Sequence, residues 1–213
     1  MSIVHHPADE LLLSYAAGAT DEATSLIVAT HLALCPRCRS TVAKAEAAGG
    51  ALLEAADSTP LSSGALKSVM SRLTEPERMA SPALRAPSNV PEPLRSYVGD
   101  DLGAIRWTSI AGGISFKPLF KSGAARAQLI RSKPGAGVGL HTHAGEEFTL
   151  CLSGGYTDVT GQYARGDLQS TTPDVLHRPL ADEGEDCIVL AVSDAPLVFQ
   201  NLGIALIAKW FGF

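Results

Sequence analysis

Residues 135–154 read G-A-G-V-G-L-H-T-H-A-G-E-E-F-T-L-C-L-S-G, and they indicate the fold of the downstream half of the chain. His141 and His143 are separated by one residue, so on a strand both side chains point to the same face. Glu147 opens the next apolar run and can reach the same point. Two histidines and a carboxylate between turn-forming glycines predict a metal site inside a β-barrel or β-sandwich.

A second block, G-D-L-Q-S-T-T-P-D-V-L-H at residues 166–177, supplies His177 as a further ligand. Three imidazoles and one carboxylate suit Zn, Fe, Mn or Ni, and we expect a divalent ion, with zinc the first choice. Glu146 should face away from Glu147 and be solvated. The alternative is a barrel that uses an ion structurally or holds none. The predicted ligand set is His141, His143, Glu147 and His177.

Short apolar runs split by glycine and proline surround these two blocks. They include A-R-A-Q-L-I-R, Y-T-D-V-T and C-I-V-L-A-V, separated by turn signals such as P-G-A-G and S-G-G. This pattern of short apolar runs separated by turn residues is typical of antiparallel strands. We therefore predict an all-β domain over residues 97–213.

The upstream half is rich in Ala and Leu at helical spacing. Pro7 suits the first position of a helix that Gly18 ends, and Thr20 is the expected N-cap of a second helix that reaches Leu34. Pro36 then begins a third helix, which runs to about residue 56, and a short fourth one covers residues 62–73. Residues 1–75 are predicted to form a small all-α bundle, short for an independent core.

Prolines separate the two halves. Five of the thirteen fall between residues 76 and 93, with small and polar residues between them. Such a stretch buries little and favours extended conformations, so we predict a linker over residues 76–96. The five prolines are Pro76, Pro82, Pro87, Pro91 and Pro93.

The helical half contains H-L-A-L-C-P-R-C, an H-x3-C-x2-C pattern. An i, i+4 spacing brings His31 and Cys35 to one helix face, and the C-x2-C turn returns Cys38 to the same point. His6, at the start of the first helix, can supply a fourth ligand, with His5 as the alternative. Two thiolates and two imidazoles suit tetrahedral zinc. Structural zinc contributes about 10–16 kcal/mol of apparent binding energy in small domains, enough to decide whether this bundle folds.

Two other interpretations of the cysteines remain. A thioredoxin-like C-P-R-C requires a preceding strand, whereas this one follows an Ala/Leu helix. Free cysteines in a helical turn would explain neither His31 nor His6. A direct thiol-redox sensor at Cys35 and Cys38 is a further alternative, in which Arg37 favours the thiolate.

Composition excludes several classes of protein. The chain has 213 residues, 46% of them hydrophobic, with a net charge of −5 and a pI near 5.6. A core can therefore form, and a role based on neutralising phosphates is disfavoured. No apolar run approaches the roughly 18 residues of a membrane span, and the N-terminus lacks the features of a signal peptide, so we expect a cytoplasmic protein.

Both halves resemble known families. Residues 97–213 resemble the cupin fold, a double-stranded β-helix or jelly roll, and carry both of its sequence blocks, although the usual Gly between Pro173 and His177 is missing. The upstream half resembles the zinc-binding anti-sigma domain, whose motif His31, Cys35 and Cys38 match. In this order the two halves are similar to ChrR-type anti-sigma factors over nearly the whole chain.

The resemblance implies a transcriptional regulator and no enzymatic activity. Its implied partner is a group IV, or extracytoplasmic-function (ECF), sigma factor of RNA polymerase, with no direct contact to nucleic acid or membrane. The zinc domain would sequester the sigma factor, and the cupin domain would sense oxidative stress such as singlet oxygen or organic hydroperoxide. The alternative is a cupin dioxygenase or isomerase with a helical appendage. Cys151 and Cys187 lie in apolar strands and are expected to be buried rather than nucleophilic.

The helical half has more apolar surface than so small a core can use, and the surplus is a candidate face for the partner. We expect about half of these side chains to be core instead. They are Leu11, Leu12, Leu13, Leu26, Ile27, Val28, Leu52 and Leu53.

Overall fold

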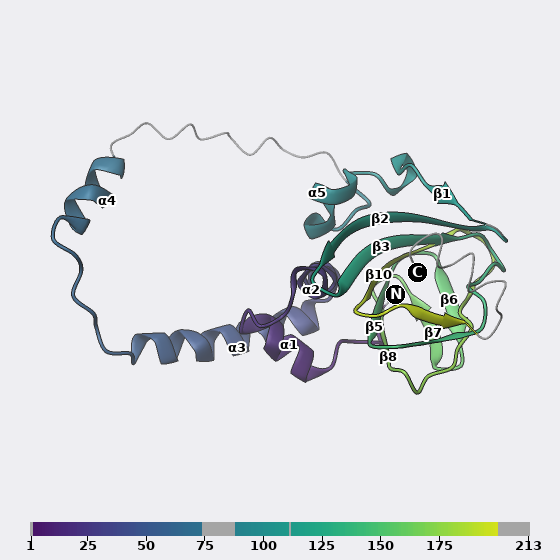
Figure 1. The fold of residues 1–213 in the computed structure, drawn as a ribbon, viewed down its shortest axis with the longest axis horizontal. Coiled ribbons are helices and arrows are strands. Elements are labelled where there is room, and N and C mark those ends of the chain that lie inside the picture. Colours follow the sequence, from purple (N-terminus) through teal and green to yellow (C-terminus); the bar gives the residue numbers. More distant parts are fainter. Residues whose placement is uncertain (1, 74–87, 111, 200–213) are drawn as a thin grey trace.

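The structure, a computed structural model, describes residues 2–73, 88–110 and 112–199. A helical N-terminal region precedes a sheet-rich domain (Figure 1), which confirms the predicted order of an all-α and an all-β part. Most of the predicted linker and the predicted end of the β domain, residues 76–87 and 200–213, lie outside the described residues.

Within residues 2–73 the chain forms four helices, at bounds close to those predicted. Three of the predicted starts are wrong. The fourth helix begins at Ala65 rather than at residue 62. The first helix begins at Asp9 rather than Pro7, and the N-cap of the second is Asp21, whose carboxylate accepts hydrogen bonds from the amides of Ala23 and Thr24. Thr20 instead bonds the Ser25 hydroxyl. The helices are α1 (Asp9–Ala16), α2 (Glu22–Leu34), α3 (Pro36–Glu54) and α4 (Ala65–Leu73).

Residues 88–96, expected to belong to the linker, form short helical turns instead. Val90 and Leu94 are fully buried beside α2, so this part of the chain is packed rather than extended. The short helical elements are η1 (Glu92–Leu94) and α5 (Arg95–Val98), which begin in this stretch, and η2 (Leu102–Ala104), which follows it.

The strands are antiparallel and form three sheets that wrap into a barrel. The largest has the order β1-β2-β3-β10-β5-β8, and the smaller ones are β11-β4 and β7-β6-β9. The strands are β1 (Thr108–Ser109), β2 (Ile114–Ser122), β3 (Ala125–Ser132), β4 (His141–His143), β5 (Glu147–Ser153), β6 (Gly155–Asp158), β7 (Gly161–Ala164), β8 (Leu168–Thr171), β9 (Leu180–Ala181), β10 (Cys187–Ser193) and β11 (Leu197–Phe199).

The two faces of the six-stranded sheet bury different cores. Along β10, Leu190 and Val192 belong to the cluster on the outer face, whereas Cys187 and Val189 pack with Cys151 toward the barrel interior. This alternation follows from the two-residue period of a strand. Cys151 and Cys187 are both buried, as predicted.

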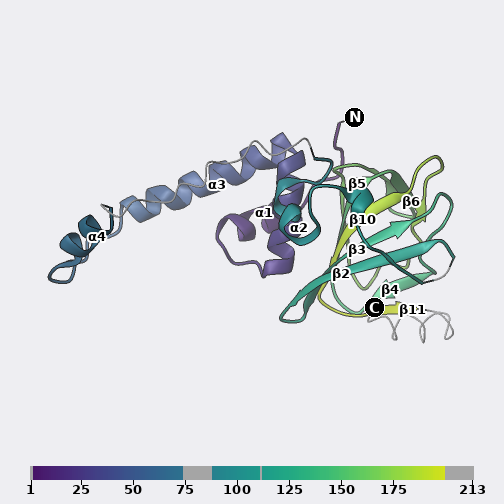
Figure 2. The ribbon, with the colours of Figure 1, turned by 90° about the horizontal axis from the view of Figure 1, so that it is seen from above.

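Helix α2 covers the outer face of the six-stranded sheet (Figure 2). Ala23, Leu26 and Ile27 belong to the same buried cluster as Leu129 and Leu190 of the strands. Fully burying a Leu or Ile side chain contributes about 1.5–3 kcal/mol, so the helical and β parts stabilise each other through a shared core.

Half of the apolar side chains considered as partner surface are core. Leu12, Leu26, Ile27 and Val28 are buried, whereas Leu13, Leu52 and Leu53 are exposed. Among the described helices, none combines the length and the hydropathy that crossing a bilayer requires.

Candidate metal centres

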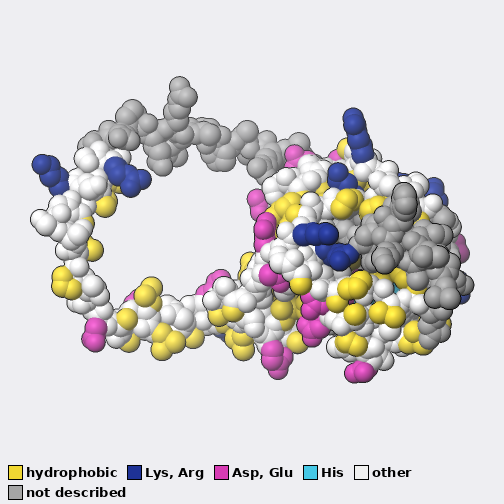
Figure 3. All heavy atoms as spheres, in the orientation of Figure 1, with side chains coloured by type: hydrophobic (Ala, Val, Ile, Leu, Met, Phe, Trp, Pro, Cys, Tyr) yellow, Lys and Arg dark blue, Asp and Glu magenta, His cyan; other side chains and the backbone are white. Residues whose placement is uncertain are grey.

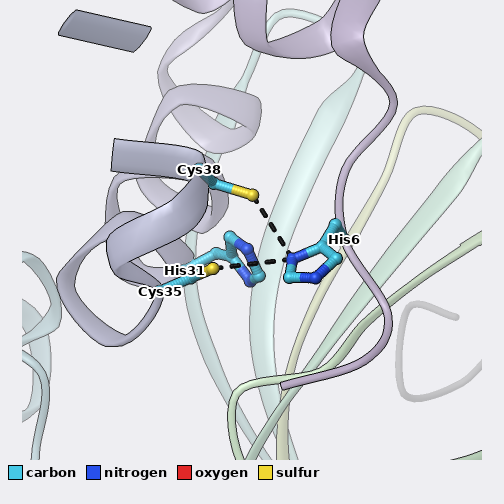
Figure 4. Close-up of side chains that lie close together, drawn as sticks. All are labelled: His6, His31, Cys35 and Cys38. Atoms are coloured by element: carbon cyan, nitrogen blue, oxygen red, sulfur yellow. Dashed lines mark hydrogen bonds between the residues drawn. The ribbon is translucent and has the colours of Figure 1, made fainter. Parts of the chain in front are cut away.

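The first cluster lies where the N-terminal segment, α2 and α3 meet (Figure 4). His6, His31, Cys35 and Cys38 each offer a ligand atom, and these atoms all lie within 4.8 Å of one another. The Nδ1 atom of His6 is 3.5 Å from the sulfur of Cys35 and 3.4 Å from that of Cys38. The structure therefore brings the four predicted residues together.

A bend between α2 and α3 positions the two cysteines. Cys35 ends α2 in an extended conformation, with φ −108° and ψ 102°, and is also the N-cap of α3. Pro36 disfavours helical geometry at the residue before it and suits the first position of the next helix. Cys38 then falls in the first turn of α3 and faces the end of α2.

The hydrogen bonding of His31 fits a metal ligand. Its Nδ1 atom donates to the carbonyl oxygen of Gly166 over 2.9 Å, so Nε2 carries the lone pair. Nε2 is buried and has no hydrogen-bond partner. Burial lowers the pKa of His31 to about 4, which keeps the ring neutral. A backbone carbonyl on the far nitrogen is the usual way in which proteins orient a ligating histidine.

The two thiols also fit a cation. Both are buried, and burial together with the neighbouring Cys35 raises the pKa of Cys38 to about 12. A divalent cation would reverse this shift, since a coordinating thiol is deprotonated outright. Two sulfurs and two imidazole nitrogens are a donor set typical of structural zinc.

His5, the alternative fourth ligand, lies elsewhere. Its ring packs on Tyr163 at a centroid distance of 4.3 Å, and its Nε2 atom is 3.1 Å from the carbonyl oxygen of Gln162. His6, rather than His5, is therefore the histidine that joins the cluster.

The second cluster lies inside the barrel. His141 and His143 come from β4, Glu147 from the start of β5, and His177 from a β-bridge with His141. Their ligand atoms lie within 4.8 Å of one another. Glu146, as predicted, is exposed.

Three imidazole nitrogens converge in this cluster. Nε2 of His177 lies 3.1 Å from Nε2 of His141 and 3.0 Å from Nε2 of His143. The Nδ1 atoms of His141 and His177 donate to the Gly139 carbonyl and the Asp158 carboxylate, so their Nε2 atoms face each other with lone pairs. Lone pairs at this distance repel unless a cation or a proton lies between them.

Burial shifts the pKa values of three of the four residues of the second cluster toward their uncharged forms. It lowers the pKa values of His141 and His143 to about 4 and raises the pKa of Glu147 to about 8. A bound divalent cation would offset the desolvation of the carboxylate. Both clusters could therefore bind a metal.

A cavity of about 270 Å³ opens onto the second cluster. His141, Glu147 and His177 line one part of it, and apolar side chains such as Ile130, Val189 and Leu197 line much of the rest. This volume is close to the lower end of small-molecule sites.

Comparison with known proteins assigns the chain to a family. The family model described as "ChrR Cupin-like domain" matches residues 97–196. Anti-sigma-E factor ChrR of Cereibacter sphaeroides is 41% identical over 211 residues, which cover 99% of each chain. The chain belongs to the ChrR family of anti-sigma factors.

One solved structure agrees with this assignment. The crystal structure of Rhodobacter sphaeroides SigE in complex with the anti-sigma ChrR contains a chain that matches with a TM-score of 0.81 and 40% identity, over 90% of this ChrR-family chain and 99% of that one. KdgF from Halomonas sp. matches 44% of this chain and 89% of its own, with 16% identity and a TM-score of 0.39.

Proposed function

We propose that this ChrR-family protein is an anti-sigma factor that sequesters a group IV (ECF) sigma factor. The observation that carries the proposal is the full-length similarity to ChrR of Cereibacter sphaeroides, together with the match to ChrR in the solved complex with Rhodobacter sphaeroides SigE. The proposed working units are residues 1–75 for sigma-factor binding, 76–96 as connection and 97–213 for sensing. The protein would act in the cytoplasm on a protein that binds DNA, without touching nucleic acid itself.

The far end of α3 and helix α4 offer a surface for such a partner. They stand away from the barrel as an arm (Figure 1), and apolar side chains lie along it (Figure 3). Leu52 and Leu53 of α3 are 76% and 78% exposed. The exposed apolar residues of α4 fall at i, i+3, i+4 and i+7, and they are Leu66, Val69, Met70 and Leu73.

This pattern favours recognition by a helix face. Four apolar side chains at that spacing form one stripe, and no residue of α4 is buried. A nine-residue helix is only marginally stable by itself, so burial against a partner would stabilise it. A groove on the sigma factor that accepts an amphipathic helix has the matching chemistry.

The proposed metal of the helical cluster is zinc, held by His6, His31, Cys35 and Cys38. Zinc here would act structurally, because four protein ligands complete a tetrahedral site. It would fix the bend between α2 and α3 and attach the N-terminal segment to it. The arm that begins with α3 would thereby be presented in one orientation.

The proposed role of the barrel is to sense oxidative stress, such as singlet oxygen or organic hydroperoxide. A divalent metal, with zinc the first choice, would be held by His141, His143, Glu147 and His177. Three histidines and one carboxylate leave positions open on a six-coordinate ion, and the cavity gives a small molecule access to them. Release of the sigma factor would follow a change at this site.

The test uses the full chain, the cognate sigma factor and size-exclusion chromatography at micromolar concentration. A stable complex that prevents the sigma factor from binding core RNA polymerase is the expected result. A sigma factor that elutes alone and stays active would refute the proposal. Addition of an organic hydroperoxide to the complex then tests release, and a complex that persists would refute the sensing step alone.

The cavity beside the second cluster also favours a second candidate, a cupin dioxygenase or isomerase. A metal with open positions can polarise a carbonyl or bind a small oxygen-containing substrate. The experiment is turnover of diketones and hydroperoxides by the Fe(II)- and Zn(II)-loaded full chain. Turnover that His177→Ala abolishes would support the enzyme, and no turnover by either form would exclude these substrates.

A further inference from the structure

Four consecutive residues, Gly166–Gln169, contact the surroundings of both clusters. They comprise the end of the turn after β7 and the first two residues of β8. Gly166 and Asp167 face the N-terminal segment and α2, and Gln169 faces the barrel interior. The four residues therefore lie between two clusters whose ligands are otherwise contributed by separate parts of the chain.

Asp167 holds the N-terminal segment directly upstream of His6. It is 3% exposed, and its Oδ1 atom accepts hydrogen bonds from the amides of Val4 and His5, over 2.7 and 2.9 Å. Its Oδ2 atom accepts from the amide of Ala164 over 2.9 Å. Both carboxylate oxygens are thus engaged, one toward each part of the molecule.

Neighbouring atoms complete this attachment. The amide of Leu168 donates to the carbonyl oxygen of His5 over 3.1 Å, so His5 is bonded through both of its backbone groups. Gly166 contributes its carbonyl oxygen to His31. The positions of two cluster residues, His6 and His31, are therefore set by atoms of the β domain.

Gln169 makes the equivalent attachment on the barrel side. It is 4% exposed, and its amide nitrogen donates to the Asp158 carboxylate over 2.7 Å. The same carboxylate oxygen accepts from Nδ1 of His177 over 2.7 Å. The side-chain oxygen of Gln169 accepts from the Tyr156 hydroxyl over 2.9 Å, which fixes the amide in one orientation.

We propose that Asp167 is a positioning residue for His6, and that Gly166–Gln169 couple the two clusters so that filling one strengthens metal binding at the other. The coupling rests on the proposal that both clusters bind metal. Ligation of His177 would shift Asp158, which His177 contacts, and through Asp158 it would shift Gln169. Strand β8 would carry this displacement to Asp167 and Gly166. Because coupling between binding sites is reciprocal, metal at the helical cluster would tighten the barrel cluster by the same factor.

Co²⁺ titration of the full chain tests the positioning role. Thiolate ligation gives Co²⁺ a charge-transfer absorption that the nitrogen and oxygen ligands of the barrel cannot give, so the helical cluster is read separately. In Asp167→Asn the side-chain amide nitrogen cannot accept a hydrogen bond. The variant therefore loses either the bonds from the amides of Val4 and His5 or the bond from the amide of Ala164, and either loss loosens the link between the N-terminal segment and the turn after β7. We expect the Co²⁺ affinity of the thiolate site to fall about 10-fold or more, the range found when partners of metal ligands are removed.

Asp101→Asn is the matched control, because Asp101 is a carboxylate of the downstream half that caps η2 through the amide of Gly103. Equal thiolate-site affinities in the two variants would refute the positioning role. If Asp167→Asn does not fold, Val4→Pro tests the same attachment, since proline lacks the amide hydrogen that Val4 donates to Oδ1 of Asp167. An unchanged affinity there would refute the role as well.

The coupling has its own measurement. The effect of His177→Ala on the Co²⁺ affinity of the thiolate site is measured twice. The first measurement uses the otherwise wild-type chain, and the second uses a chain that already carries Gln169→Ala. We expect a reduction of about 5-fold or more from His177→Ala in the wild-type background, typical of coupled sites, and no reduction when Gln169 is absent. Equal reductions in both backgrounds would refute transmission through Gln169, and no thiolate absorption in any variant would refute the metal assignment instead.

Discussion

The Nδ1 atom of His31 donates to the carbonyl oxygen of Gly166 over 2.9 Å, and 135 positions of the sequence separate these two residues. A residue of the helical cluster is therefore oriented by a turn of the β domain. Together with the shared core beneath α2, this bond makes the two parts one packed unit. The proposed coupling of the two clusters would therefore have a direct contact between the barrel and the helical cluster to act through.

Gly166→Ala should destabilise the chain by more than its backbone conformation alone explains. Gly166 has φ +96°, and an added Cβ would lie 2.6 Å from the end of the Ile3 side chain. The left-handed backbone costs about 1–2 kcal/mol, and displacing Ile3 adds about 1 kcal/mol more. Thermal unfolding followed by circular dichroism measures the difference.

Gly184→Ala is the control for this prediction. Gly184 has φ +110°, and an added Cβ would meet nothing within 4 Å, so this variant carries the backbone cost alone. A loss in Gly184→Ala equal to that in Gly166→Ala would show that the contact with Ile3 contributes nothing.

His31→Ala should remove the metal of the helical cluster and unfold the helical region in part. The variant takes away one of four ligands and leaves the Gly166 carbonyl without its donor. Structural zinc is worth about 10–16 kcal/mol in small domains, so its loss outweighs the lost hydrogen bond, worth about 1 kcal/mol. Metal analysis should show one equivalent fewer per chain, and circular dichroism less helix. An unchanged metal content would contradict the ligand set.

Much of the helical cluster could be predicted because its spacing is local. His31, Cys35 and Cys38 lie within eight residues, and the helix period with the bend at Pro36 brings them together. The choice between His5 and His6 could not be made in this way. The two residues are adjacent in the sequence. His5 is held away from the cluster by its contacts with β7 and with the turn before β8, and contacts between such distant segments leave no local signal in the sequence.

Partner contacts of the ligands were missed for the same reason. Asp158, Asp167 and Gln169 belong to no ligand spacing, and their importance appears only when the strands are paired. The packing of α2 was also missed. Its apolar side chains fit a core face and a partner face equally well, and only the outer face of the six-stranded sheet decides between them.

His141→Ala should leave binding of the sigma factor intact and reduce the response to hydroperoxide. His141 is buried in the barrel, away from the exposed arm that we assign to the partner. The variant removes a ligand from the barrel cluster and leaves all four residues of the helical cluster in place. Metal content and sigma-factor affinity are measured together, followed by release from the complex on addition of the hydroperoxide. If His31→Ala and His141→Ala abolish inhibition alike, the division of roles between the two clusters is wrong.

Leu66→Glu in α4 should weaken binding of the sigma factor without lowering the stability of the free protein. Leu66 is 70% exposed and belongs to the apolar stripe of α4, so the free chain loses no buried contact, whereas the complex must bury a carboxylate. We expect the dissociation constant of the complex to rise about 10-fold or more, which equals a loss of about 1.4 kcal/mol of binding free energy. Isothermal titration calorimetry measures this constant. Ser68→Glu introduces the same side chain at an exposed position of α4 outside the stripe, and it should bind as the wild type does. Equal weakening by both variants would indicate repulsion by charge and would contradict recognition of the apolar face.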